Sequence, residues 1–179
     1  MTQNRTLSLI LPAFGAAIIA ALAQIVIPIG AVPITLQTFA VGLVAAILKP
    51  REATLAATLY LILGAIGLPV FAGGGGGLQA FFGPSAGYLL AYPFFALVTS
   101  ELTLEKTQKR KIFLAFVLGD ALVFVGGILS LHFLGKMGWS AAVAVGLTPF
   151  IIPDLLKGLI VALVTKPVLK ALKNHSYFN

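Results

Sequence analysis

The chain has 179 residues, of which 59% are hydrophobic and only 9% are charged, and its mean hydropathy is +1.05. Ordinary globular chains carry roughly a quarter charged residues, so this composition excludes a typical soluble domain and indicates a membrane protein. A net charge of +7 does not indicate a nucleic-acid partner, because the twelve basic residues lie between apolar runs and not on one basic face. The absence of cysteine excludes disulfides and thiol chemistry.

Apolar runs fill most of the chain and predict six helices. A membrane span takes about 20 apolar residues, so six spans with short loops would use nearly all of residues 1–179 as a single transmembrane domain. No room remains for an ATPase or a separate receptor domain. The expected helices are Leu7–Ile27, Thr35–Leu48, Glu52–Ile66, Ser85–Leu102, Ile112–Leu134 and Pro149–Leu172.

The first three apolar runs can each be interpreted in a second way. The first imitates a cleaved secretory signal, with Ala21-Leu22-Ala23 as the cleavage site, but it continues to Pro28 and the later runs are equally hydrophobic, which favours a retained span. The second and third are short and are separated only by Lys49-Pro50-Arg51, so we expect a tight hairpin because Pro50 cannot continue a helix. An interfacial or core-buried pair is the alternative.

The basic residues are distributed unevenly between the loops. Cytoplasmic loops are enriched in Lys and Arg, and one set of connections carries nearly all of them. The opposite connections contain a single basic residue, Lys136. We therefore expect both termini in the cytoplasm. The residues on the basic side are Arg5, Lys49, Arg51, Lys106, Lys109, Arg110, Lys111, Lys166, Lys170 and Lys173.

The longest outer connection, residues 67–84, is rich in glycine and aromatic residues. Five glycines from Gly73 to Gly77 are flanked by Phe71, Phe81 and Phe82. Glycine lets the backbone approach a ligand closely, and an apolar loop of this length is costly in water unless it is covered, so a lid over an outward-facing pocket is favoured over a flexible linker. A phosphate-binding P-loop is excluded, because no Gly-Lys-Ser/Thr follows the glycines.

Three ionisable residues fall inside predicted spans, where a charge costs about 2.5–3.5 kcal/mol and marks a functional candidate. Asp154 and Lys157 are three residues apart in the last helix and therefore share a face. They form either a packing ion pair or part of a pocket for a ligand with N–H donors and a carboxylate. Asp120 has no partner identifiable from sequence, and it is either a proton carrier or a residue near the cytoplasmic interface.

The first helix carries Ala13, Ala17 and Ala21 at four-residue spacing. Small residues at this spacing allow close helix approach. Packing within the chain and docking of another membrane protein explain the pattern equally well.

Several ordered motifs together resemble the BioY family, the biotin-specific substrate-binding (S) components of energy-coupling factor (ECF) transporters. The resemblance spans most of the chain, although Ser85-Ala86 and Pro153 depart from the usual Thr-Gly and Gly of the family. The motifs are Val32-Pro33-Ile34-Thr35-Leu36-Gln37-Thr38, Gly67-Leu68-Pro69-Val70-Phe71, Gly83-Pro84-Ser85-Ala86-Gly87-Tyr88-Leu89 and Pro153-Asp154-Leu155-Leu156-Lys157.

This resemblance implies an all-α integral membrane protein of a prokaryotic cell membrane, with six transmembrane helices and a Gly-rich extracellular lid loop. It implies biotin as transported ligand, no cofactor or metal, and three partner subunits: a transmembrane coupling subunit and two cytoplasmic ATPases. The alanines of the first helix would meet the coupling subunit. The implied biotin-binding residues are Asp154, Lys157, Gln79, Tyr88, Gln37, Thr35, Phe71 and Phe81.

Two other functions compete with this one. A stand-alone proton-coupled secondary transporter would use Asp120 as its relay. An intramembrane enzyme is disfavoured, because the sequence offers no HExxH, no paired intramembrane Asp motif and no convincing Ser/His pair.

Overall fold

The computed structural model describes residues 2–28, 32–103, 108–172 and 177, with the backbone alone at residues 2–6. Lys106 and Lys173, which the topology prediction counted as basic-side residues, lie outside the described part, as does the side chain of Arg5. The elements in chain order are α1 (Thr2–Leu22), β1 (Val26–Ile27), β2 (Ile34–Thr35), α2 (Gln37–Ile47), α3 (Pro50–Ala65), the 3-10 turns η1 (Ala72–Gly74) and η2 (Leu78–Phe81), α4 (Ala86–Thr103), α5 (Lys109–Phe133), α6 (Trp139–Gly146) and α7 (Ile151–Leu172).

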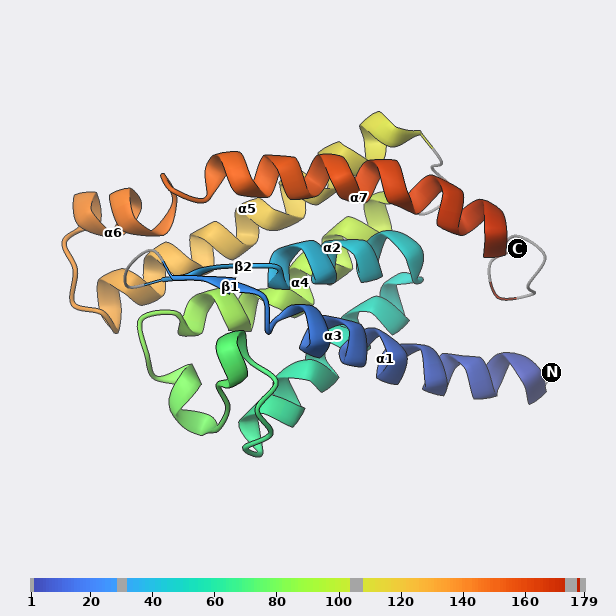
Figure 1. Ribbon diagram of the computed structural model, residues 1–179, viewed down its shortest axis with the longest axis horizontal. Coiled ribbons are helices and arrows are strands. Elements are labelled where there is room, and N and C mark those ends of the chain that lie inside the picture. Colours follow the sequence, from blue (N-terminus) through green and yellow to red (C-terminus); the bar gives the residue numbers. More distant parts are fainter. Residues whose placement is uncertain (1, 29–31, 104–107, 173–176, 178–179) are drawn as a thin grey trace.

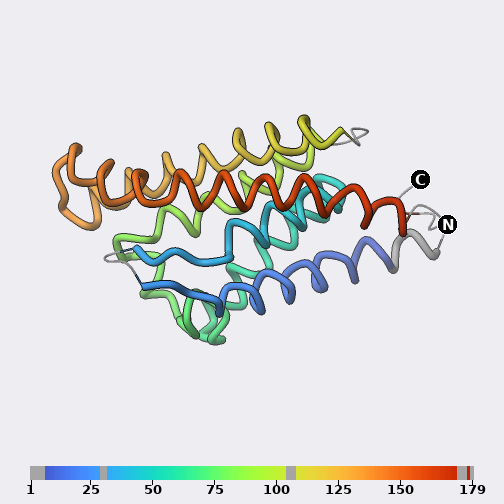
Figure 2. The backbone as a smooth tube through the Cα atoms, turned by 45° about the horizontal axis from the view of Figure 1, so that its top comes forward, coloured from blue at the N-terminus to red at the C-terminus, as the bar shows by residue number. Residues whose placement is uncertain are grey.

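The helices form an elongated bundle in which the start of α1 and the end of α7 lie at the same end (Figure 1). The turn between α2 and α3 also lies at that end, whereas α6 and the β1–β2 hairpin lie at the opposite end, as the second view confirms (Figure 2). The fold is therefore all-helical apart from one short antiparallel hairpin, in which Val26 pairs with Thr35.

Helices α4 and α5 pack with their backbones almost in contact. A Cβ atom built on Gly87 would lie 1.8 Å from the carbonyl oxygen of Gly126, and one built on Gly126 would lie 2.5 Å from the carbonyl oxygen of Gly87. Both distances are far below van der Waals contact, so only glycine fits at this crossing. The close approach fixes the start of α4 against the middle of α5.

All six predicted helices are present as α1, α2, α3, α4, α5 and α7, but two predicted boundaries in the first connection are wrong. Helix α1 ends at Leu22 and not at Ile27, because Val26 and Ile27 instead form the strand that pairs with Ile34 and Thr35. Thr35 accordingly lies in a strand, and α2 begins at Gln37. β-Branched residues before a proline favour extended backbone, and a short strand satisfies their amide and carbonyl groups.

The predicted tight hairpin between α2 and α3 is confirmed, and its backbone groups are capped from distant parts of the chain. Ser100 of α4 donates to the Leu48 carbonyl oxygen over 2.6 Å, and the amide of Lys49 donates to the Tyr177 hydroxyl over 3.1 Å. That hydroxyl donates to buried Glu52 over 3.2 Å. Burial raises the pKa of Tyr177, so the phenol stays a neutral donor at the C-terminal end of the chain.

Helix α6, residues Trp139–Gly146, was expected to be part of an irregular outer loop and is a further correction. The Trp139 ring at the start of α6 stacks on the His132 ring of α5, with the two ring centroids 3.9 Å apart. By length and composition, one helix of the described chain, α5, could cross a membrane alone, and α6 with α7 passes the same test as a pair bent by 42°. The count of six membrane crossings thus stays a prediction.

Candidate ligand-binding site

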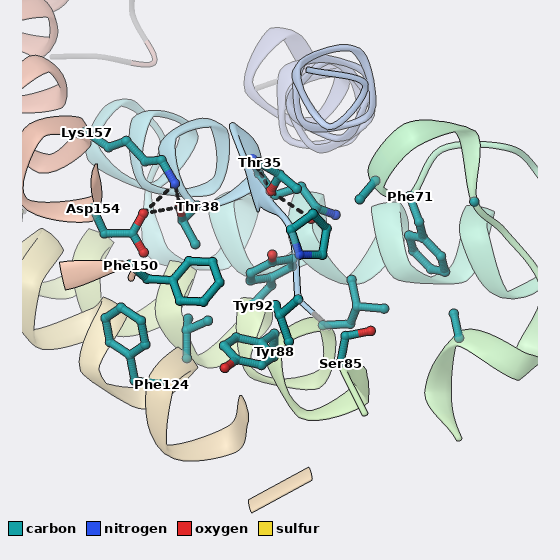
Figure 3. Close-up of a pocket in the computed structure, with 18 of the residues that line it drawn as sticks. Thr35, Thr38, Phe71, Ser85, Tyr88, Tyr92, Phe124, Phe150, Asp154 and Lys157 are labelled. Atoms are coloured by element: carbon teal, nitrogen blue, oxygen red, sulfur yellow. Dashed lines mark hydrogen bonds and ion pairs between the residues drawn. The ribbon is translucent and has the colours of Figure 1, made fainter. Parts of the chain in front are cut away.

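A cavity of about 440 Å³ lies at the end of the bundle opposite the α2–α3 turn. Pockets for small organic ligands are typically about 300–1,000 Å³. Strand β2, the glycine loop (residues 67–84), the N-terminal parts of α2, α4 and α7 and the middle of α5 surround it, and Figure 3 shows their side chains converging. The lining residues are Val32, Pro33, Thr35, Gln37, Thr38, Phe71, Ala72, Gly75, Gly76, Gln79, Ala80, Ser85, Tyr88, Leu89, Tyr92, Val123, Phe124, Phe150, Asp154 and Lys157.

Asp154 and Lys157 form a buried ion pair in the wall of this cavity, with 4% and 7% of their surfaces exposed. Lys157 Nζ donates to Asp154 Oδ1 and, over 2.9 Å, to the hydroxyl of Thr38. The Thr38 hydroxyl in turn donates to Asp154 Oδ1 over 3.2 Å (Figure 3). Three groups from two helices therefore form a closed hydrogen-bonded triangle.

Asp154 and Lys157 each keep a hydrogen-bonding position that the triangle does not use. Asp154 Oδ1 accepts both bonds, and among the described residues Oδ2 has no partner. An ammonium group has three donors, and Lys157 uses two of them within the triangle. A ligand can therefore donate to Asp154 and accept from Lys157 without breaking the pair.

The start of α7 places these two residues. Pro153 fits the first turn of a helix, where its missing N–H group costs nothing, and the amide of Asp154 donates to the Phe150 carbonyl oxygen over 2.8 Å. Asp154 thus lies in the first turn, where the helix dipole stabilises a carboxylate. Lys157 follows at three residues, so the predicted shared face is confirmed.

A second polar chain runs from β2 into α2 at the cavity. The Thr35 hydroxyl donates to Gln37 Oε1 over 3.0 Å, and Gln37 Nε2 donates to the Tyr60 hydroxyl over 2.5 Å. The backbone amide of Gln37 also donates to the Thr35 hydroxyl over 3.2 Å, which caps the start of α2. These bonds fix the orientation of the Gln37 amide toward α3.

Aromatic rings supply the apolar walls. Tyr88 and Tyr92 of α4, Phe124 of α5 and Phe150 before α7 point into the same space in Figure 3. Tyr88 also packs on Phe150, with ring centroids 6.3 Å apart. Its hydroxyl donates to the Gly146 carbonyl oxygen over 2.7 Å, so the bond ties α4 to the end of α6 and leaves only acceptor capacity for a ligand.

The glycine loop closes one side of the cavity through its backbone. Gly75 and Gly76 line the cavity, and a Cβ atom on Gly76 would lie 2.4 Å from the Leu68 carbonyl oxygen. Gly77 has a φ of 91°, a conformation that residues with a side chain rarely adopt. Gln79 Nε2 donates to the Gly76 carbonyl oxygen over 2.6 Å, so this side chain holds the loop.

The structure brings together seven of the eight residues predicted for the ligand, namely Thr35, Gln37, Phe71, Gln79, Tyr88, Asp154 and Lys157. Phe81 is not among the lining residues. It packs edge-on against Phe71, with centroids 5.7 Å apart, and so supports the wall from behind. Phe82, which also flanks the five glycines in the sequence, is 76% exposed.

The predicted docking alanines lie on α1, which contributes no lining residue to this cavity. Ala13, Ala17 and Ala21 are all exposed on α1, whereas Ala16 and Ile19 between them are fully buried. Packing of α1 within the chain uses Gly15, where an added Cβ would lie 2.8 Å from that of Ala56 on α3. The three spaced alanines therefore form a free face of the described chain.

Sequence reasoning missed four lining residues that matter to the geometry: Thr38, Tyr92, Phe124 and Phe150. Thr38 is the last residue of one of the family motifs. It follows Gln37 at the polar start of an apolar helix, and this position could have identified it as a lining residue. No local pattern distinguishes Phe124 or Phe150 from the apolar residues around them in the sequence. Among the described residues, no three His, Asp or Glu side chains gather as a metal site.

Comparison with known proteins identifies the family of this chain. The model of the BioY family matches residues 1–174. The chain belongs to the BioY family. Biotin transporter BioY2 of Lactococcus lactis subsp. cremoris is 43% identical over 99% of both chains, and biotin transporter BioY of Thermotoga maritima is 39% identical over 79% of this chain and 83% of its own.

A solved structure shares the fold. It is the crystal structure of the S-component for biotin from an ECF-type ABC transporter, and it aligns with a TM-score of 0.87 at 28% sequence identity. The alignment covers 95% of this chain and 94% of the solved chain. The family resemblance seen in the sequence motifs is thereby confirmed, and so is the all-helical fold of an S-component.

Proposed function

We propose that this chain binds biotin with high affinity and carries it across the cell membrane of a prokaryote, as the S-component of an ATP-driven ECF transporter. Its relatives in the BioY family are named as biotin transporters, and its fold matches the S-component for biotin. The single observation that carries the proposal is the Asp154–Lys157–Thr38 triangle in the wall of a ligand-sized cavity. The family is one of transporters, which favours a non-enzymatic role.

Biotin has a ureido group, fused rings and a carboxylate, and the cavity offers a complement to each. Its ureido N–H groups suit Asp154 Oδ2, which has no partner among the described residues, while the third donor of Lys157 is open to the biotin carboxylate. Its fused rings suit the walls made by Phe71, Tyr92 and Phe150. Gln37 and Thr35 adjoin these walls with a fixed amide and hydroxyl.

The proposal includes a membrane arrangement. Six helices, α1 to α5 and α7, cross the bilayer, with both termini in the cytoplasm and the cavity facing outward. The grouping of the α2–α3 turn, the start of α1 and the end of α7 at one end supports this orientation (Figure 1), because that end carries Lys49 and Arg51. The loop of residues 67–84 then acts as an extracellular lid over bound biotin.

The proposed partners are a transmembrane coupling subunit and two cytoplasmic ATPases. The face formed by Ala13, Ala17 and Ala21 supports docking of the coupling subunit, because it is exposed while the opposite face of α1 packs on α3. Small side chains there let a partner helix approach closely. The proton-coupled alternative is disfavoured by the likeness to ECF-type relatives.

Titration calorimetry of the detergent-purified protein with biotin tests the ligand. We expect a strong binding heat that Asp154→Asn and Lys157→Ala each weaken severely, and that the exposed-acid control Glu101→Gln leaves unchanged. Absence of binding heat together with absence of co-purified biotin would overturn the proposal. Uptake into vesicles separates the mechanisms: it should follow ATP and added partner subunits, not the proton gradient.

A further inference from the structure

Asp120 is a buried acid of α5 that the proposed ligand site leaves without a role. Only 4% of its surface is exposed. One helical turn later in α5, Val123 lines the cavity, and one turn earlier Phe116 packs against Gly42 of α2 and Gly158 of α7. Asp120 therefore lies in the packed layer directly beneath the cavity, on the side of the α2–α3 turn.

The Asp120 carboxyl lacks the partners that the other buried acids have. Its Oδ1 atom is fully buried and has no hydrogen-bond partner among the described residues. Asp154 accepts from Lys157 and Thr38, and Glu52 accepts from Tyr177. An ionised carboxylate without donors is very costly in an apolar interior, and such a group becomes neutral instead.

Among the residues that the structure describes, no unpaired cation faces Asp120. Helix α5 packs against α2, α4, α6 and α7. The ionisable side chains that interact with Asp120 are Tyr92 on α4 and both Asp154 and Lys157 on α7. Helices α2 and α6 contain no ionisable side chain. Lys157 is already bonded to Asp154 and Thr38. If Asp120 were ionised, two carboxylates would compete for one ammonium group.

We propose that Asp120 is a proton-binding site beneath the ligand cavity, and that its proton keeps Lys157 paired with Asp154 and available to the ligand. Loss of the proton creates a second anion that draws Lys157 away from the cavity and repels a ligand carboxylate. Ligand binding and proton retention at Asp120 therefore reinforce each other. The link to biotin rests on the proposed function, whereas the bound proton itself does not, and no proton is transported.

Infrared spectroscopy tests the bound proton directly. Asp120 and Asp154 are the only two aspartates of the sequence, so a carbon-13 label on the aspartate side-chain carboxyl reports on these two groups alone. We expect one labelled carboxylic acid band at neutral pH in a carbonyl-free maltoside detergent. The band should vanish in Asp120→Asn and persist in the double variant Asp154→Asn with Lys157→Met, which removes the other aspartate without leaving a free ammonium group near Asp120. A wild-type spectrum with labelled carboxylates only, or a band that survives in Asp120→Asn, would overturn the proposal.

Biotin affinity as a function of pH tests the linkage. Asp120→Asn keeps a neutral group of the same shape, so it should bind biotin like the wild type at neutral pH. At alkaline pH the wild-type affinity should fall more steeply, by up to an additional factor of about ten per pH unit, the limit for one linked proton. Tyr92, Asp154 and Lys157 are present in both proteins, so the difference between the two profiles isolates Asp120.

The proposal for Asp120 and the proposed function can fail independently, and the experiments distinguish the two failures. Profiles that coincide throughout the pH range would refute the linkage. If neither protein binds biotin, the proposed function fails, and the infrared bands still decide whether Asp120 holds a proton. If Asp120→Asn does not fold, the labelled wild type compared with the double variant Asp154→Asn with Lys157→Met gives the same decision, because only Asp120 then remains to account for an acid band.

Discussion

Thr38 on α2 and Asp154 on α7 are 116 positions apart in the sequence, and the hydroxyl of the first donates to the carboxylate of the second over 3.2 Å. The same hydroxyl accepts from Lys157 over 2.9 Å. Thr38 is thus both donor and acceptor between the two charges of the ion pair. It fixes the relative positions of α2 and α7 at the cavity wall. The geometry of the ion pair is therefore set by α2 as well as by α7.

Thr38→Val should weaken biotin binding while preserving side-chain volume. The change removes one bond to each charge of the pair, and a buried hydrogen bond to a charged group contributes about 1.5–3 kcal/mol, or roughly ten- to a hundredfold in Kd. Thr38→Ser keeps the hydroxyl and should retain most of the affinity. Calorimetry of both variants measures the difference, and equal Kd values for Val and Ser would show that the hydroxyl is not required.

Removing one charge of the ion pair should destabilise the protein more than removing both. Lys157→Met leaves the Asp154 carboxylate buried without its cation, which costs about 3–5 kcal/mol. The double variant Asp154→Asn with Lys157→Met should recover much of this loss in thermal unfolding in detergent, and neither variant should bind biotin tightly. A double variant less stable than Lys157→Met would contradict this account of the pair.

Gly76→Ala should disturb the glycine loop, because the new Cβ atom would lie 2.4 Å from the Leu68 carbonyl oxygen. Overpacking against rigid backbone costs about 1–3 kcal/mol, so we expect weaker biotin binding and a lower midpoint of thermal unfolding. Gly83→Ala is the matched control, since the nearest atom to its Cβ would be 4.0 Å away. Similar behaviour of the two variants would show that the close contact is not important for the loop.

Ala17→Leu should separate docking from ligand binding. The side chain is exposed on α1, so the added atoms should leave biotin affinity within about twofold, whereas a partner helix can no longer approach closely. We expect uptake to fall at least about tenfold, which corresponds to roughly 1.4 kcal/mol of docking free energy. Ala121→Leu on the exposed face of α5 is the control and should preserve uptake. Loss of uptake in both variants would argue against a specific role of the alanine face.

Local patterns were sufficient to predict most helices and one site pair. Apolar runs predict α1 to α5 and α7 because burial of a helix face depends on residues that are neighbours in sequence. Pro50 predicts the α2–α3 hairpin, since proline lacks an N–H group for the helical hydrogen bond and is best accommodated at a helix start. The spacing of Asp154 and Lys157 predicts their contact, because residues three apart in a helix lie on one face.

The remaining features depend on contacts between distant segments, which no local pattern specifies. Val26 and Ile27 read as a continuation of α1, and only pairing with Ile34 and Thr35 makes them a strand. Phe71 lines the cavity while Phe81 lies behind it, a difference set by how the glycine loop folds.

By itself, the sequence determined an apolar helical chain with a polar pair on its last helix and a glycine-rich loop, because periodicity and backbone preference act between near neighbours. The tertiary structure alone decided that Thr38 joins that pair from another helix, and that Asp120 lies beneath it without a hydrogen-bond partner among the described residues. Both outcomes follow from how α2, α5 and α7 pack, since the environment of a buried polar group is set by whichever distant helices surround it.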